Sequence, residues 1–211
     1  MITPVRSFKR FTTGHLLPTI LCVSLVLVTS ISYSQNSGAA KDTMAQLLDY
    51  SRPGLNHALL GKLAGTWNFQ DAKLSFVKGT LTRKPIYDGR FYVVEIKGGK
   101  LPLPVADGKM KEDFYQGMQT EGYDNGRMKF VATAINNHIG SDIQLQTGSY
   151  DAATHAFTYE WDDELITGMK VHNWRVLTVT DKDHYTEEYF EDNNGSKQKV
   201  RQLNYTRVVG N

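Results

Sequence analysis

Cysteine is almost absent from this 211-residue chain, which has a single one, Cys22. One cysteine cannot form an intramolecular disulfide, so the sequence excludes a disulfide-stapled scaffold and a metal site built from several thiolates. An excess of one charge is also absent, because 24 Lys and Arg residues stand against 22 Asp and Glu residues. Such a balance offers no basic surface for phosphates, and we expect no nucleic-acid partner.

Apolar runs of transmembrane length are missing as well. The longest run, Leu16 to Val28, would span only about 20 Å as a helix, which is shorter than the hydrocarbon core of a bilayer. It contains Cys22 and follows three basic residues, Arg6, Lys9 and Arg10. A basic segment followed by a short apolar run is typical of a secretory signal peptide.

Small residues after the apolar run indicate where this peptide ends. Ser32 and Ser34 occupy the positions that a signal peptidase reads, so we predict a signal peptide over residues 1–34 with cleavage before Gln35. Its removal would take three of the 24 basic residues and no acidic one, which leaves 21 basic against 22 acidic residues. We therefore expect an exported protein, periplasmic or secreted, with no membrane span once the peptide is cleaved.

Sustained helical periodicity is also lacking. Residues 35–54 are predicted to form a linker with a short helix over 42–48, and residues 55–64 to form another short helical segment. From Trp67 onward the chain shows short runs of β-type alternation, over residues 67–76, 81–86, 90–97, 114–123, 128–135, 143–150, 156–161, 171–180, 184–190 and 199–209. The first run is interrupted at Asp71-Ala72-Lys73, which predicts a bulge or bend in that strand.

Turn-forming clusters such as Asp88-Gly89 and Gly98-Gly99 separate these runs at intervals of roughly ten residues. This spacing is typical of hairpins that follow one another along the chain. Closure of such a meander into a barrel would remove its unpaired edges. We therefore predict an all-β fold, a single antiparallel up-and-down β-barrel over residues 55–211, with a short N-terminal helical segment.

Three residues carry a resemblance to a known class of barrels. Gly65 and Trp67 follow a short helical segment, which resembles the G-x-W opening of the lipocalin-like (calycin) barrels. In those barrels an Arg of the last strand lies against the Trp, and Arg207 is the matching residue here. The resemblance implies a lipocalin-like fold with Gly65, Trp67 and Arg207 as its structural signature.

The chain more closely resembles the DUF1579 family of uncharacterised, often exported bacterial proteins. Between His57 and Val209, four motifs occur in the family's order: Gly65-Thr66-Trp67, Gly122-Tyr123-Asp124-Asn125, Gly148-Ser149-Tyr150-Asp151 and Tyr205-Thr206-Arg207. The chain departs from the family's pattern where Ala134 and Asn136 replace a Trp and an Asp. Some related barrels hold haem through a C-terminal His, but residues 198–211 contain none, so we expect no haem or other cofactor.

Metal-ligand patterns are absent. Short metal-site spacings do not occur among the five histidines beyond residue 34, which are His57, His138, His155, His172 and His184. An acidic cluster surrounds Trp161, but it lacks the alternation with Gly of a calcium loop; its members are Glu160, Asp162, Asp163 and Glu164. A solvated turn is favoured there over a Ca²⁺ site or an acid–base pair, and we predict no bound metal.

Aromatic side chains on the predicted strands are the candidates for a binding site. Because side chains alternate along a strand, Tyr159 and Trp161 share one face, and Tyr185, Glu187 and Tyr189 share another. Faces of this kind either line a small-molecule pocket or simply fill the barrel. The predicted ligand-binding residues are Tyr92, Tyr159, Trp161, Trp174, Tyr185, Glu187 and Tyr189.

Two functional hypotheses follow from these residues. The first is an exported protein that binds a small apolar or aromatic molecule in the barrel. The second is a cofactor-free lyase, isomerase or hydrolase at the barrel mouth, with Tyr185, Glu187 and Arg175 as acid, base and anion clamp. The first is favoured, because no catalytic constellation is recognisable in the sequence.

Overall fold

The computed structural model describes residues 37–193 and 195–209. The predicted signal peptide, its cleavage site and Cys22 lie outside the described residues. None of the helices in the described part of the chain is long and apolar enough to cross a membrane.

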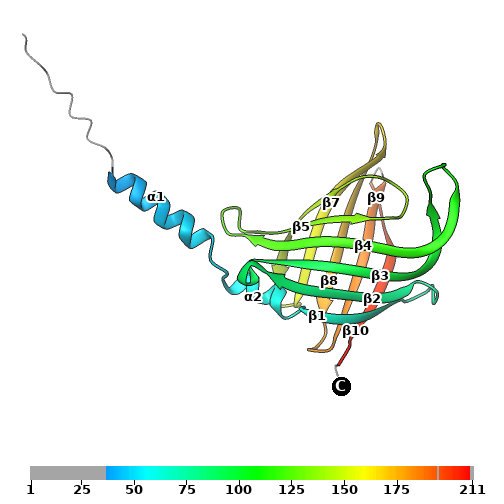
Figure 1. The fold of residues 1–211 in the computed structure, drawn as a ribbon, viewed down its shortest axis with the longest axis horizontal. Helices are drawn as coiled ribbons and strands as arrows, with labels where there is room; N and C mark the ends of the chain where they lie inside the picture. The colour runs from blue at the N-terminus through cyan, green and yellow to red at the C-terminus, as the bar shows by residue number, and fades with distance from the viewer. Residues whose placement is uncertain (1–36, 194, 210–211) are drawn as a thin grey trace, which may run out of the picture.

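Ten antiparallel strands form a closed barrel, which confirms the fold predicted from the sequence (Figure 1). The strands pair in chain order, and the ring closes where β1 pairs with β10. They are β1 (Gly65–Asp71), β2 (Lys78–Ile86), β3 (Phe91–Pro104), β4 (Met110–Asp124), β5 (Lys129–Asn136), β6 (Gln144–Asp151), β7 (Ala156–Ile166), β8 (Met169–Val179), β9 (His184–Asn193) and β10 (Ser196–Arg207).

Alternating polarity explains how the strands curl around one interior. In β7, Phe157, Tyr159 and Trp161 are buried, whereas Glu160 and Asp162 between and beyond them are exposed. Burial of apolar side chains is favourable, so the apolar face of each strand turns toward the interior and the polar face remains in water. The same two-residue period therefore determines both the strands and the closed interior.

The β3–β4 hairpin is longer than predicted. A turn was expected at Gly98-Gly99, but β3 continues through these residues to Pro104 and pairs with β4 from Met110 onward. The ladder register shifts between Lys97 and Lys100, so the two glycines form an irregularity within the strand. A Cβ on Gly98 would lie 2.8 Å from Cβ of Tyr115, and this close approach accounts for the glycine.

The first predicted run, residues 67–76, was expected to continue as a strand beyond its interruption at residues 71–73, and this part of the prediction is wrong. β1 ends at Asp71, whose Oδ1 accepts hydrogen bonds from the N–H groups of Lys73 and Leu74 at 2.8 and 2.9 Å. This side chain forms a local turn, and β2 begins at Lys78.

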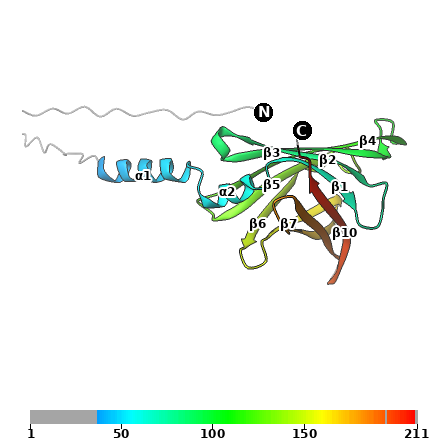
Figure 2. The same ribbon diagram turned by 90° about the horizontal axis from the view of Figure 1, so that it is seen from below.

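Two helices precede the barrel, α1 (Ser37–Tyr50) and α2 (Leu55–Gly61). α1 begins before and ends after the predicted helix over 42–48, which was therefore predicted too short at both ends. It points away from the barrel in both views (Figures 1 and 2). Its last turn is attached through Asn125, whose Nδ2 donates to the Tyr50 carbonyl oxygen at 2.8 Å.

α2 covers one end of the barrel, which we call the closed end. Leu60 of α2 and Leu63 just after it are buried with the side chains of Trp67 and Phe157. Because the strands form a meander, every second connection lies at this end, including the single turn η1 (Tyr87–Gly89) between β2 and β3. The five other hairpins, beginning with β1–β2 and β3–β4, surround the opposite end, the mouth.

Candidate ligand-binding site

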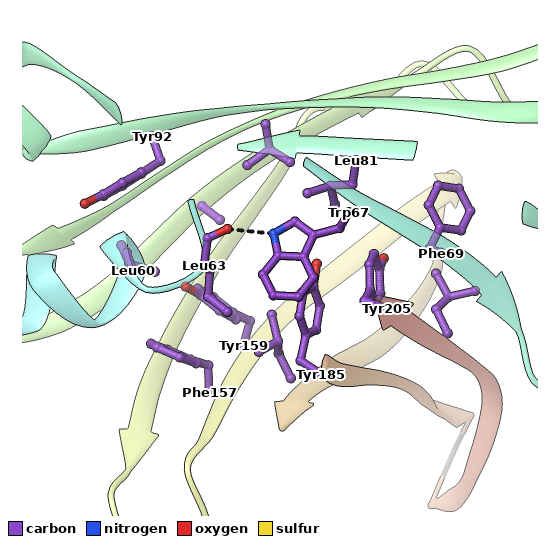
Figure 3. Close-up of a cluster of buried hydrophobic side chains, with 14 of the residues drawn as sticks. Leu60, Leu63, Trp67, Phe69, Leu81, Tyr92, Phe157, Tyr159, Tyr185 and Tyr205 are labelled. Atoms are coloured by element: carbon purple, nitrogen blue, oxygen red, sulfur yellow. Dashed lines mark hydrogen bonds between the residues drawn. The ribbon is translucent and has the colours of Figure 1, made fainter. Parts of the chain in front are cut away.

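The closed end is built around Trp67. Its ring lies beside Leu63 and Tyr185 in Figure 3, and its Nε1 donates a 2.9 Å hydrogen bond to the Leu63 carbonyl oxygen. The guanidinium carbon of Arg207 lies 4.0 Å from the Trp67 ring centroid, and the two residues are register partners on β1 and β10. The contact expected between Trp67 and Arg207 is therefore present where the first and last strands meet.

Arg207 also ties this closure to the backbone around it. Its guanidinium donates to the carbonyl oxygens of Lys62, Ala64 and Lys182 at 2.9, 2.6 and 2.8 Å. Gly65 lies beside it with a φ of +117°, and a Cβ there would be 2.8 Å from Nη1 of Arg207. Both the backbone conformation and the available space therefore require glycine at this position.

Two buried ion pairs cross the middle of the barrel and form a polar layer. Arg83 donates to both carboxylate oxygens of Glu121 at 2.8 and 3.2 Å, and Arg175 pairs with Glu187. Nη2 of Arg175 lies 3.6 Å from Oε1 of Glu121, which links the two pairs. Burial would raise the pKa of Glu121, but the charges of Arg83 and Arg175 hold it below its ordinary value. The layer contains equal numbers of cations and anions, as stable burial of charge requires.

Two tyrosines complete the bonding of Glu187. The hydroxyls of Tyr189 and Tyr205 each donate a 3.0 Å hydrogen bond to Oε2 of this carboxylate. Burial raises the pKa of both tyrosines well above the ordinary value, and the negative charge of Glu187 raises it further. Both hydroxyls therefore stay protonated, and the carboxylate is held by three donors when Arg175 is counted.

Between the polar layer and the mouth lies a cavity of about 440 Å³. Arg175, Gln146 and Tyr205 are among the residues at its base. Nε of Arg175 donates to Oε1 of Gln146 at 2.9 Å, so these side chains hold one another in place. The cavity is of the size that small-molecule sites commonly have.

Opposite sides of this cavity differ in chemistry. One side, the apolar wall, is formed on β1, β3 and β10 by Phe69, Ile96 and Leu203. The other, the carboxamide wall, is formed on β4, β6 and β8 by Gln119, Gln144, Gln146 and Asn173. In the order of strands around the barrel, β6 lies across from β1, so a ligand between them would touch both walls.

An acidic side chain stands at the mouth end of the carboxamide wall. Oδ2 of Asp163 accepts hydrogen bonds from Nε1 of Trp161 at 3.0 Å and from Nδ2 of Asn173 at 3.1 Å. Burial raises the pKa of Asp163, the Trp161 hydrogen bond opposes this rise, and the carboxylates of Asp142 and Glu191 add to it. This carboxyl group therefore faces the interior, whereas Asp162 of the same acidic cluster is exposed.

The described histidines do not gather into a site. His57 is buried and accepts a 3.0 Å hydrogen bond from the Gly54 N–H, whereas Nδ1 of His172 lies 2.8 Å from the carboxylate of Asp162 on the surface. Within the described residues, no three His, Cys, Asp or Glu side chains are arranged so that they could hold a metal ion.

All four sequence motifs lie at the closed end. Besides the closure itself, Asp124 and Asp151 begin tight turns, where they accept hydrogen bonds from the N–H groups of Gly126 at 2.9 Å and Ala153 at 2.8 Å. The profile of the DUF1579 family, described as a protein of unknown function, matches residues 52–207. The chain belongs to the DUF1579 family. No match was found among curated proteins.

The two positions at which we expect a departure from the DUF1579 pattern lie elsewhere. Ala134 and Asn136 both line the cavity near the mouth. Ala134 pairs with Gln119 on one side and with Gln144 on the other, so it occupies the middle of a row across β4, β5 and β6. The small side chain of Ala134 therefore leaves space between two members of the carboxamide wall.

The structure divides the seven predicted ligand-binding residues of this DUF1579 barrel into groups. Trp161 and Tyr189 line the cavity. Tyr159, Tyr185 and Glu187 also face inward, but they are buried at the level of the polar layer or closer to the closed end. They can support the base of the cavity without lining it.

The other two predicted residues lie away from the cavity. The hydroxyl of Tyr92 donates to the backbone of α2 at 3.1 Å, which places this side chain at the closed end. Trp174 falls between the inward-facing Asn173 and Arg175, so the two-residue period directs it to the outer face, where its ring stacks on Phe190 at 5.1 Å.

Several residues of the site were not singled out from the sequence. The alternation of side chains contained a signal for them, because Arg83 lies two residues after the inward Leu81, and Glu121 lies two residues before Tyr123. Polar residues on the inward, otherwise apolar face of a strand indicate a polar layer inside the barrel. The residues missed in this way include Arg83, Gln119, Glu121, Gln146 and Asn173.

Proposed function

We propose that this DUF1579 protein binds a small molecule in the cavity at the mouth of its barrel. The observation that carries the proposal is the contrast between the two halves of the interior. Toward the closed end the barrel is filled by side chains such as Trp67, Phe157 and Tyr185. Toward the mouth the inward side chains leave about 440 Å³ of space between an apolar wall and a carboxamide wall. An apolar surface with a few polar groups is the usual composition of a ligand site.

The geometry gives less support to the enzyme hypothesis. Tyr185, named there as an acid, is buried against Trp67 with ring centroids 4.6 Å apart, on the side of the polar layer away from the cavity. Arg175 and Glu187 are bonded to each other and to neighbouring side chains. A base and an anion clamp need atoms that reach a substrate, whereas the Glu187 carboxylate is held by three donors and Nη2 of Arg175, which has no hydrogen bond, is buried 3.6 Å from Oε1 of Glu121.

The first test is to fill the cavity. Ala134→Trp would place an indole between Gln119 and Gln144, and Ala152→Trp, in an exposed turn at the closed end, is the matched control. We expect mass spectrometry of small molecules extracted from the native protein to detect a compound with the wild type and with Ala152→Trp, and at least about tenfold less of it with Ala134→Trp. Equal recovery from all three proteins would refute binding in this cavity.

We also infer that the protein is exported and that its barrel is related to the lipocalin-like barrels. Export is supported by the basic segment and short apolar run before Ser34. The lipocalin relationship is supported by Gly65 and Trp67 after a short helix and by the stacking of Arg207 on Trp67. Both inferences agree with a binding protein that meets its ligand outside the cytoplasm.

A further inference from the structure

Charged groups around the cavity are largely matched within the protein itself. Arg175 is paired with Glu187 and bonded to Gln146, and Arg201 lies 3.7 Å from the carboxylate of Asp71. The three other charged residues along the lining, Lys78, Asp163 and Glu191, lie toward the mouth, where Asp163 accepts hydrogen bonds from Trp161 and Asn173. The base of the cavity therefore offers no uncompensated charge to an ionic ligand.

Hydrogen-bonding capacity, in contrast, is left over on the carboxamide wall. The side chain of Gln119 makes no hydrogen bond to another described residue, and its Oε1 is buried. Gln144 accepts a 3.1 Å hydrogen bond from Nε2 of Gln146, and its own Nε2 donates to no described group. A carboxamide presents both donors and an acceptor, and a hydroxyl is a neutral group that complements both.

The apolar wall determines which second feature the ligand needs. Phe69 and Leu203 are at most 8% exposed, so a ligand that covers them and Ile96 would complete an apolar surface already mostly withdrawn from water. Such a surface favours a flat or ring-shaped hydrocarbon face. The two walls therefore select for a molecule with one apolar face and polar groups at its opposite edge.

We propose that the ligand is an uncharged ring compound bearing hydroxyl groups, with its hydroxyls on the carboxamide wall and its hydrocarbon face on the apolar wall. This inference rests on the proposed function and specifies the class of ligand for the same site.

Probes that share one ring frame test this class. Isothermal titration calorimetry would compare a naphthalene diol with methylnaphthalene, naphthoate and naphthylmethylammonium at neutral pH. We expect the diol to bind at least about tenfold more tightly than the two ions, because at the base of the cavity each ion must lose its hydration without gaining an unpaired counter-charge. It should also bind more tightly than methylnaphthalene, which leaves the carboxamides without partners.

Gln119→Leu separates a role in binding from a role in folding. The substitution removes a buried oxygen that has no partner, so we expect the unliganded protein to be as stable as the wild type or more stable. The affinity for the diol should nevertheless fall about three- to tenfold, whereas the affinity for methylnaphthalene should not fall. Gln198→Leu, at an exposed position of β10, is the control and should change neither affinity.

The outcomes distinguish this inference from the proposed function. If an ionic probe binds as tightly as the diol, or if Gln119→Leu leaves the affinity for the diol unchanged, the ligand class is wrong. The proposed function would still stand, provided that Ala134→Trp abolishes binding of the probe. If no probe binds the wild type and Ala134→Trp retains as much extracted compound as Ala152→Trp, both proposals fail.

Discussion

Arg83 and Glu121 form an ion pair whose side chains are only 1% and 2% exposed. Each charge alone would carry a large desolvation cost, so the two residues are stable in the interior only as a hydrogen-bonded pair. Arg83 also donates to the Leu63 carbonyl oxygen at 3.2 Å, which is the same oxygen that accepts from Trp67. The pair therefore connects the polar layer to the chain segment that closes the barrel.

Removal of one partner should be far more damaging than removal of an exposed charge. Glu121→Gln leaves the Arg83 guanidinium buried without its counter-ion, and we expect the free energy of unfolding to fall by about 3–5 kcal/mol. Glu95→Gln is the control, since Glu95 pairs with Lys84 at 3.9 Å with both side chains more than half exposed. That change should cost less than about 1 kcal/mol, measured by guanidinium unfolding. Equal losses would mean that water reaches the polar layer.

The same variant should alter the response to acid. The pKa of Glu121 is lowered in the folded protein, so its ionisation stabilises the fold above the ordinary value of 4.5. This contribution is lost as the pH falls below 4.5 through the lowered pKa of the folded state. We therefore expect stability to depend less steeply on pH in this range in Glu121→Gln than in the wild type.

At the scale of elements, a cation–π contact reinforces the paired strands β1 and β10 where they meet at the closed end. Stacking of Arg207 on Trp67 is worth about 0.5–2 kcal/mol, whereas loss of the buried indole costs about 3–5 kcal/mol. Trp67→Ala should therefore destabilise the protein more than Arg207→Ala, and thermal unfolding of the single and double variants should reveal coupling between them. Strictly additive losses would show that the two side chains stabilise the closure independently.

Strand positions follow from local patterns, and this is why most of them could be predicted. Alternating polarity and turn residues are properties of neighbouring positions in the sequence. The β3–β4 hairpin was predicted too short because the conformation at Gly98-Gly99 depends on the close approach of Tyr115, which is distant in sequence. Long-range packing of this kind leaves no local signal.

Depth along the barrel axis was the part of the site that the sequence did not reveal. Tyr185 and Tyr189 share a face of β9, and the pattern treats them alike, yet the first packs against Trp67 and the second lines the cavity. Which inward residues reach the cavity depends on the position of each strand along the axis. That stagger is a property of the closed sheet and not of any single strand.

At the scale of the whole molecule, the predicted signal peptide can be tested directly. We expect the exported protein to begin within one or two residues of Gln35, because the small residues Ser32 and Ser34 follow the apolar run. N-terminal sequencing of protein recovered outside the cytoplasm measures this. A membrane-bound protein that retains residues 1–34 would contradict the prediction.

The alternation of hairpins divides the barrel into two parts with different tolerance to change. Trp67, Arg207 and the aspartate turns lie at the closed end, whereas five connections lie at the mouth, at the opposite ends of the strands. Exchange of a mouth connection for one of another length would alter the entrance and leave the closure intact, since long surface loops carry only a small entropic cost. This architecture is therefore a scaffold on which new specificities can be built by loop grafting.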